Sequence, residues 1–184
     1  MKRSDIVKLA GINVVGVESG VAEGEFSYQV LSEQDVKHWY SIDMWAGDRG
    51  HDAGQMSRAT NRLKPFAHKN TIIHNKFSAV VDDFSDEYFD FIYVDGYAHT
   101  GQEGGETLTD WWPKLKRGGI FAGDDYSTQW PLTVASVDAF VAEHNLKLHI
   151  HEFDQHTHWS RFPSWYVYKP CDPSELTFDQ LSEL

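Results

Sequence analysis

The chain has 184 residues, of which 41% are hydrophobic, and a formal net charge of -12. This length fits a single domain, spanning residues 1–184, that is large enough to bury a sizeable core. The negative charge, with no basic stripe to offset it, argues against binding to nucleic acid or to an anionic membrane surface. No apolar run approaches the roughly 20 residues of a membrane span, and the amino end lacks the apolar core of a signal peptide. The single cysteine, Cys171, cannot form an internal disulfide, so we expect a soluble, cytoplasmic protein that acts on a small molecule.

Short apolar runs alternate with helical patterns along the chain. Runs rich in β-branched and aromatic residues predict strands at 13–18, 39–43, 71–74, 89–95, 119–124, 147–153 and 165–169. The segments between them predict helices at 24–34, 51–66, 78–84, 101–115 and 132–144. This alternation is typical of a parallel sheet with helices on both faces, and the last two strands, which lack a helix between them, predict an antiparallel pair. The predicted fold is therefore Rossmann-like α/β, with a seven-stranded, mostly parallel sheet. The tail after Lys169 is expected to fray or to form one short helix.

The first predicted strand runs into a glycine turn within VGVESGVAEGEFS, residues 15–27. Ligands of such sheets bind outside the carboxyl ends of the strands. Gly20 and Gly24 would let the backbone approach a ligand closely, and the helix that follows offers free amide groups. The spacing differs from the G-x-G-x-x-G of dinucleotide sites, and Glu18 would repel a pyrophosphate. A carboxylate at this place would instead hold a cationic amino group.

The second predicted strand ends in Asp43, within YSIDMW. Its carboxylate could accept hydrogen bonds from both hydroxyls of a ribose, and Met44 and Trp45 could pack against a flat base. The alternative is that Asp43 caps a loop and Trp45 belongs to the core. The preceding glycine turn and Glu18 favour the ribose interpretation.

The stretches VGVESGVAEGEFS, YSIDMW, FDFIYVDGYAH and WWPKLKRGGIFAGDDY resemble, in this order, the motifs of class I S-adenosylmethionine-dependent methyltransferases. The resemblance is to small metal-dependent sugar and small-molecule O-methyltransferases in particular, and it extends from about Val14 to Tyr126. It implies S-adenosylmethionine as cofactor, with Asp43 on the ribose and Met44 on the adenine. Residues 75–78 would lie near the adenine, where Ser78 or a backbone amide makes the contact. The remaining cofactor-binding residues implied by the resemblance are Glu18, Ser19, Gly20, Gly24, Ser27 and Asp95.

Three aspartates follow the fourth and fifth predicted strands: Asp95, Asp124 and Asp125. Neighbouring parallel strands lie ~4.8 Å apart, so these carboxylates can converge at one edge of the sheet. Three hard oxygen ligands suit Mg²⁺, Mn²⁺ or Ca²⁺, and the O-methyltransferases that the chain resembles bind such an ion with acids at these places. The alternative is that Asp124 caps a turn while Asp95 only contacts the cofactor. Because three carboxylates without a cation repel one another, we expect a divalent metal site.

The predicted reaction is methyl transfer to a hydroxyl of a small molecule. A divalent ion would lower the pKa of that hydroxyl, and orientation of the two reactants would supply most of the remaining rate enhancement. We expect Asp95 and His99 to be catalytic. Tyr97 stands where the resembling sugar methyltransferases have an acid, which leaves His99, with an ordinary pKa near 6.5, as the candidate general base. The alternative for His99 is a surface position at a helix entry.

Several other features allow a functional and a structural interpretation. The histidines of HIHEFDQHTHW, residues 149–159, could bind a transition metal, but a solvated edge strand and polar loop are favoured because no partner motif completes a ligand set. The glycine-rich segment 47–55 is expected to form a lid. Core packing is expected for Trp111 and Trp112. An aromatic wall of the acceptor pocket is the hypothesis for Trp45, Trp130 and Trp159.

Two other classes of protein share this layered fold. A nicotinamide-dependent oxidoreductase would show the dinucleotide fingerprint that this chain lacks. The second class is a non-catalytic cofactor-binding or interaction protein on the same fold. This alternative is retained because Tyr97 replaces the acid of the resembling sugar methyltransferases. The chain has no room for a separate recognition domain. Loops must therefore form the acceptor pocket, which a second subunit of a homo-oligomer could complete.

Overall fold

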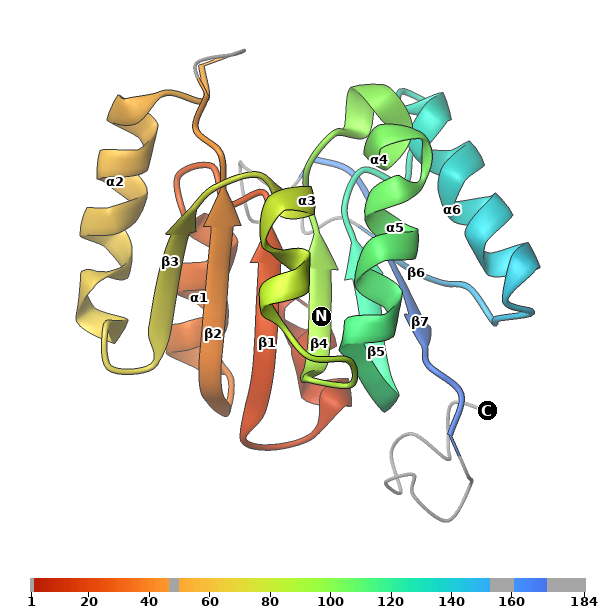
Figure 1. The fold of residues 1–184 in the computed structure, drawn as a ribbon, viewed down its shortest axis with the longest axis horizontal. Helices are drawn as coiled ribbons and strands as arrows, with labels where there is room; N and C mark the ends of the chain where they lie inside the picture. Colours follow the sequence, from red (N-terminus) through yellow and green to blue (C-terminus); the bar gives the residue numbers. More distant parts are fainter. Residues whose placement is uncertain (1, 47–49, 153–160, 172–184) are drawn as a thin grey trace.

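The computed structural model describes residues 2–46, 50–152 and 161–171. Its centre is a seven-stranded sheet in the order β3-β2-β1-β4-β5-β7-β6 (Figure 1). Strands β1 to β5 pair in parallel, whereas β7 runs antiparallel to both β5 and β6. This confirms the predicted fold class. The strands are β1 (Val14–Ser19), β2 (Val36–Asp43), β3 (Asn70–His74), β4 (Phe89–Val94), β5 (Leu115–Gly123), β6 (His149–His151) and β7 (Ser164–Tyr168).

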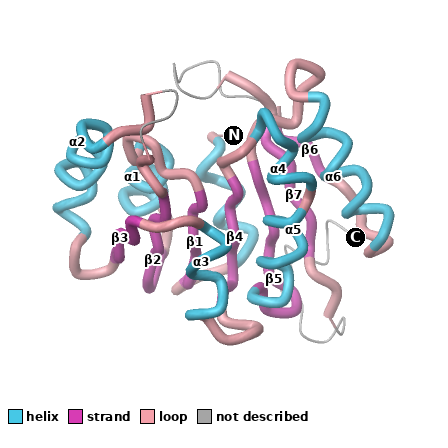
Figure 2. Tube along the Cα trace, turned by 45° about the horizontal axis from the view of Figure 1, so that its top comes forward, coloured by secondary structure: helices cyan, strands magenta, loops and turns pink. Residues whose placement is uncertain are grey.

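Helices cover both faces of the sheet (Figure 2). One face carries the 3₁₀ helix η1 (Arg3–Ala10), α1 (Glu25–Glu33) and α2 (Ala53–Leu63). The other carries α3 (Phe77–Val80), α5 (Glu106–Trp111) and α6 (Pro131–Glu143). Short helical turns complete the connections: η2 (Lys64–Phe66), η3 (Val81–Asp83), η4 (Ala98–Thr100), α4 (Gly101–Gly104) and η5 (Trp112–Lys114). Within the described residues, no helix is long and apolar enough to cross a membrane.

Each face of the sheet has its own hydrophobic core, because successive strand residues point to opposite sides. Phe91 and Tyr93 of β4 join the core beneath η1 and α1, while Ile92 and Val94 join the core beneath α5 and α6. Trp111 is fully buried in the second core, as expected. Trp45 is also buried, in the first core, so it is not an exposed wall of a substrate pocket.

The predicted helix 101–115 is confirmed only over Glu106–Trp111. Five consecutive residues, 101–105, have positive φ, and they include three glycines, so the backbone leaves the helical region there. Regular helix is limited to Glu106–Trp111, and β5 already begins at Leu115. Pro113 follows in the tight turn η5, because its ring prevents a continued α-helix.

Other boundaries also differ from the sequence prediction. The 3₁₀ helix η1 has no counterpart in the predicted elements, and it buries Ile6 and Val7 against β4 and β5. Strands β2 and β5 begin earlier than predicted, and β6 is shorter. The short helix expected in the tail lies outside the described residues, as do residues 47–49 of the expected lid.

The chain order of the strands reverses between β1 and β4, where the carboxyl ends of the two strands meet. The backbone amide of Asp95 donates to the carbonyl of Ser19 at 2.7 Å. Gly20 has a φ of 102°, and a Cβ at this position would lie 1.9 Å from the carbonyl oxygen of Asp95. Glycine is therefore required for the two strand ends to lie together, and this contact positions the candidate site.

Candidate functional site

A buried hydrogen-bond network surrounds Glu18 at the end of β1. The carboxyl group bonds to the hydroxyl of Ser27 on α1, which bonds in turn to the Ser41 hydroxyl at 2.8 Å. The indole N–H of Trp39 also donates to Ser27 Oγ, at 2.8 Å. Ser41 donates onward to Asn70 at 3.0 Å. The carboxyl thus bonds to one neutral hydroxyl, which is itself bonded to further neutral groups, and we call the five side chains the Glu18 network.

Burial raises the pKa of Glu18 to about 8, although the Ser27 hydrogen bond acts in the opposite direction. The Ser27 hydroxyl donates to Glu18 and the Ser41 hydroxyl donates to Asn70, so each hydroxyl already uses its one proton. Because its pKa is about 8, Glu18 is mostly neutral at pH 7 in the free protein.

A cavity of about 240 Å³ opens beside this network. The turn from β1 to α1 forms one wall, with Gly20, Val21 and Ala22, and Gly24, with a φ of 78°, directly precedes α1. The hydroxyl of Ser19 is buried nearby in the chain and has no hydrogen-bond partner among the described residues. Five carboxyl-bearing residues line the cavity, namely Glu18, Glu25, Asp95, Asp124 and Asp125. The predicted binding turn and the predicted metal ligands thus share one cavity.

Asp43 lies at the end of β2 and is almost fully buried. Its Oδ2 accepts from the amide of Ala22 and its Oδ1 from the amide of Trp45, both at 2.9 Å. Each oxygen retains a further lone pair. Asp43 and Met44 line a second, smaller cavity of about 50 Å³, which shares Gly20 with the first one. The residues predicted to hold the ribose and the adenine are thus adjacent to those predicted to hold the methionine part.

Tyr97 lines the same small cavity. Its backbone is left-handed, with a φ of 61°, and its ring packs edge-on against Phe77 with centroids 5.2 Å apart. The Tyr97 hydroxyl donates to the sulfur of Met44 at 3.6 Å. Sequence reasoning treated this residue only as the loss of an acid. The aromatic residue directly after the Asp95-Gly96 turn was the signal that could have placed it at the cavity.

Ser78 and His99 occupy less enclosed positions than expected. Both are exposed, and neither lines either of the two cavities. Phe77, one residue before Ser78, faces the smaller cavity instead, because α3 begins at Phe77 and turns that ring inward. His99 lies on η4, beyond the turn that carries Tyr97.

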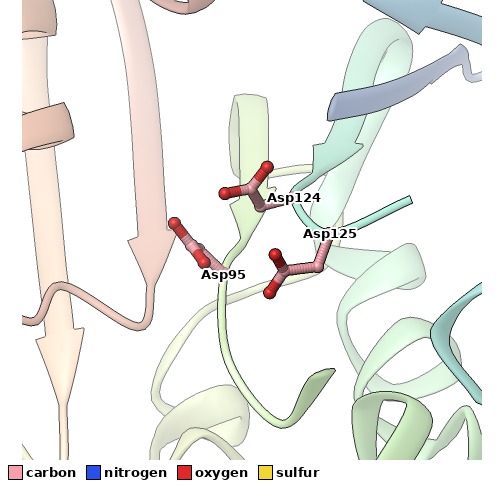
Figure 3. Close-up of side chains that lie close together, drawn as sticks. All are labelled: Asp95, Asp124 and Asp125. Carbon is pink, nitrogen blue, oxygen red and sulfur yellow. The ribbon is translucent and has the colours of Figure 1, made fainter. Parts of the chain in front are cut away.

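Asp95, Asp124 and Asp125 form a cluster that we call the acidic rim (Figure 3). One carboxylate oxygen from each residue lies within 4.8 Å of the others. The three side chains approach from the ends of β4 and β5, as the strand order predicts. A Cβ at Gly123 would lie 2.7 Å from both Trp165 and the carbonyl of Val94, so glycine lets β5 pack closely just before Asp124.

The electrostatics of the acidic rim favour a cation. Burial raises the pKa of Asp95 well above its ordinary value, and the charges of Asp124 and Asp125 raise it further. Burial and the charge of Asp124 raise the pKa of Asp125 to about 7. Three hard oxygen donors within reach of one point match the ligand set of Mg²⁺, Mn²⁺ or Ca²⁺. The residues present therefore fit a divalent ion.

Arg3 is a member of the site that sequence reasoning missed. Its guanidinium, on η1, donates to Asp124 Oδ2 at 2.5 Å and to the carbonyl of Phe162 at 3.1 Å. Its Nη1 also lies 4.0 Å from Asp95 Oδ2. The side chain is only 2% exposed. Arg3 is far from Asp124 in the sequence, and the only local signal was a basic residue preceding the apolar pair Ile6-Val7.

The remaining candidates line neither cavity or fall outside the described residues. His149 stacks on Tyr166, with ring centroids 4.8 Å apart, and His151 is buried on β6. Trp130 packs edge-on against Phe162 at 6.0 Å. His156, His158 and Trp159 fall outside the residues that the structure describes.

Comparison with known proteins agrees with this arrangement. The model of a family described as "Methyltransferase domain" matches residues 17–126, more than half of the chain. That range contains the Glu18 network and the acidic rim. The chain belongs to this family and is an S-adenosylmethionine-dependent methyltransferase. The predicted cofactor is thus supported over the nicotinamide alternative.

Solved structures share the fold at low sequence identity. Precorrin-6y C5,15-methyltransferase from Geobacter metallireducens is 15% identical, with a TM-score of 0.64, over 89% of this chain and 85% of that one. An S-adenosylmethionine-dependent O-methyltransferase from Thermotoga maritima is 14% identical, with a TM-score of 0.63, over 94% of this chain and 66% of that one. Spermidine synthase from Thermotoga maritima is 16% identical, with a TM-score of 0.67, over 94% and 59%. The search of curated proteins finds no match.

Proposed function

We propose that the protein transfers a methyl group to a hydroxyl of a small-molecule acceptor, with a divalent cation held at the acidic rim. The observation that carries this proposal is the shared cavity. Asp95, Asp124 and Asp125 line the same space as Glu18 and the Gly20 turn. A cation at the acidic rim would therefore lie next to the binding site of the methyl donor.

The residues of the two cavities fit S-adenosylmethionine, which supplies an electrophilic methyl group when bound. The Gly20 to Gly24 turn lets the backbone come close to a ligand, and the buried Ser19 hydroxyl has no partner among the described residues. Glu18, Ser19 and the turn would hold the methionine part. The nucleoside would be held by Asp43, Met44 and Tyr97, which line the smaller cavity.

A divalent ion at the acidic rim would lower the pKa of an acceptor hydroxyl. The carboxylates of the rim would orient the acceptor, and they line the cavity where its proton is released. His99 is less well placed as a general base, because it is exposed and lines neither cavity. We therefore place proton acceptance at the acidic rim, whose carboxylates line the larger cavity.

The test is methyl transfer by the purified protein to a panel of phenols, catechols and sugars, with Mg²⁺ and with a chelator. We expect turnover of at least one hydroxyl acceptor that requires the ion and is lost in Asp125→Asn. Asp86→Asn, at an exposed carboxylate far from the cavity lining, is the matched control and should retain full activity. Equal turnover in chelator would contradict the role of the cation. No turnover with any acceptor, despite cofactor binding, would instead favour a non-catalytic binding protein.

A further inference from the structure

The acidic rim contains a permanent positive charge that belongs to the chain itself. Arg3 is buried, and its guanidinium joins three parts of the molecule: Asp124 after β5, the carbonyl of Phe162 before β7, and Asp95 after β4 at the longer distance of 4.0 Å. A guanidinium stays protonated at every pH at which the protein is folded. The charge is therefore a fixed property of the site.

The 3₁₀ helix η1 holds Arg3 in place. Ile6 and Val7 of this helix are fully buried in the core beneath the sheet. Lys2 forms an ion pair with Glu33 of α1 at 2.6 Å, and the Ser4 hydroxyl donates to the same carboxylate at 3.2 Å. Contacts of Lys2 before Arg3, and of Ser4, Ile6 and Val7 after it, thus fix the position of Arg3 beside the rim.

Arg3 donates a hydrogen bond to one carboxylate oxygen of Asp124. Asp124 Oδ2 accepts its hydrogen bond, and Asp124 Oδ1 lies 3.5 Å from the Ser164 hydroxyl that donates to it. Asp95 and Asp125 have no such short contact with Arg3. When all three carboxyls are ionised, the guanidinium of Arg3 offsets one of their three negative charges, and a divalent ion would add opposing charge in the cavity, which Arg161 also lines.

We propose that Arg3 is a positioning residue of the acidic rim, which holds Asp124 in place and weakens the hold of the rim on a divalent cation by supplying part of the opposing charge. The inference rests on the proposed function, in which such an ion binds at the rim. Arg3 would keep the ion on the side of Asp95 and Asp125, next to the cavity. Its positive charge would also offset part of the negative charge of the rim, so that a bound ion can be released to solvent.

The test is the affinity for Mn²⁺ alone, measured by electron paramagnetic resonance on the full chain. Arg3→Gln removes the charge but keeps a hydrogen-bond donor, and we expect it to bind Mn²⁺ about tenfold more tightly, because a repelling cation a few ångströms away is gone. Arg3→Lys keeps the charge and loses the planar fork, and its affinity should stay within about threefold of the wild type. Equal or weaker Mn²⁺ binding by Arg3→Gln would overturn the inference.

Binding of S-adenosylhomocysteine to the same variants separates the two proposals. If wild type and Arg3→Gln bind Mn²⁺ equally tightly, the inference is wrong while the proposed cation site stands. If neither binds Mn²⁺ although both bind S-adenosylhomocysteine, both the cation site and the inference are wrong.

A second measurement applies if Arg3→Gln is too unstable for the Mn²⁺ titration but still gives a melting transition. The double variant Arg3→Gln, Asp124→Asn removes both charges of the buried pair, so we expect it to melt at a higher temperature than Arg3→Gln alone. A double variant whose loss in melting temperature equals the sum of the two single losses would show that Arg3 does not act through Asp124. That result would overturn the inference.

Discussion

The Glu18 network and the acidic rim lie at the same edge of the sheet but satisfy their carboxyl groups in opposite ways. In the network, one buried carboxyl bonds to a neutral hydroxyl, and burial raises its pKa to about 8, so the protonated form predominates at pH 7. In the rim, three carboxyls lie together, and the buried guanidinium of Arg3 donates a hydrogen bond to one of them. The comparison teaches that one edge can hold a neutral wall for the methyl donor and a charged wall for a cation. Which wall a substitution touches should decide its effect.

The largest expected effect is at the rim. Asp124→Ala leaves the buried guanidinium of Arg3 without its carboxylate, and we expect a loss of about 3–5 kcal/mol in the free energy of unfolding, measured by urea denaturation. The matched control is Asp86→Ala, which removes the partner of Lys114 at a carboxylate that is 69% exposed. That change should alter stability by about 0–1 kcal/mol. Similar losses in the two variants would mean that the rim is not a charge-balanced unit.

The second largest effect is expected where the ends of β1 and β4 contact each other, at Gly20 and Asp95. Gly20→Ala places a Cβ against the carbonyl of Asp95 and forces a non-glycine residue to a φ of 102°. We expect a loss of about 2–4 kcal/mol, together with weakened S-adenosylhomocysteine binding. Gly104→Ala separates the two causes, because it has a φ of 70° with no atom within 4 Å, and should lose about 1 kcal/mol. If calorimetry and denaturation give equal losses for both variants, the close approach of β1 and β4 is unimportant.

Within the Glu18 network, Ser27→Ala removes the hydroxyl that bonds to three other side chains, Glu18, Trp39 and Ser41. The indole N–H of Trp39 and the carboxyl of Glu18 would both lose a partner in a buried place. We expect a loss of about 1–3 kcal/mol in thermal or chemical denaturation. A Ser27→Cys variant of similar size serves as control for packing. A neutral result for Ser27→Ala would show that water satisfies the network.

The smallest effect is expected for Glu18→Gln, which imitates the protonated carboxyl. Its stability at pH 6 should change by less than about 1 kcal/mol. In the wild type, the folded protein holds a proton on Glu18 from the ordinary pKa of 4.5 up to about 8, whereas the unfolded chain has released it. The free energy of unfolding should therefore fall as the pH rises through this window.

Glu18→Gln should make that fall shallower, and the remaining slope should come from the rim, where Asp125 acts in the same direction up to a pKa of about 7. Urea titrations at half-unit steps of pH measure both slopes. An unchanged slope in Glu18→Gln would contradict the neutral state of the network.

The sequence predicted those parts of the site that depend on strand ends. Gly20, Asp43 and the three aspartates each follow a strand whose apolar pattern is plain, and parallel strands bring their carboxyl ends to one edge. Arg3 could not be found in this way, because only the packing of η1 brings it to Asp124. The helix predicted at 101–115 does not extend over residues 101–105. Their five successive positive φ angles depend on tertiary packing around the glycines. From the sequence, Tyr97 is notable only as the replacement of an expected acid. Its contact with Phe77 depends on the folded loop.

The most direct test of the account is a crystal structure with S-adenosylhomocysteine and Mn²⁺, with anomalous scattering recorded to locate the ion. We predict an anomalous peak bounded by Asp95 and Asp125, with the amino acid part of S-adenosylhomocysteine beside Glu18 and the Gly20 turn. A structure with S-adenosylhomocysteine in both cavities and no peak at the rim would contradict the cation-assisted mechanism. S-adenosylhomocysteine bound away from these cavities would contradict the site itself.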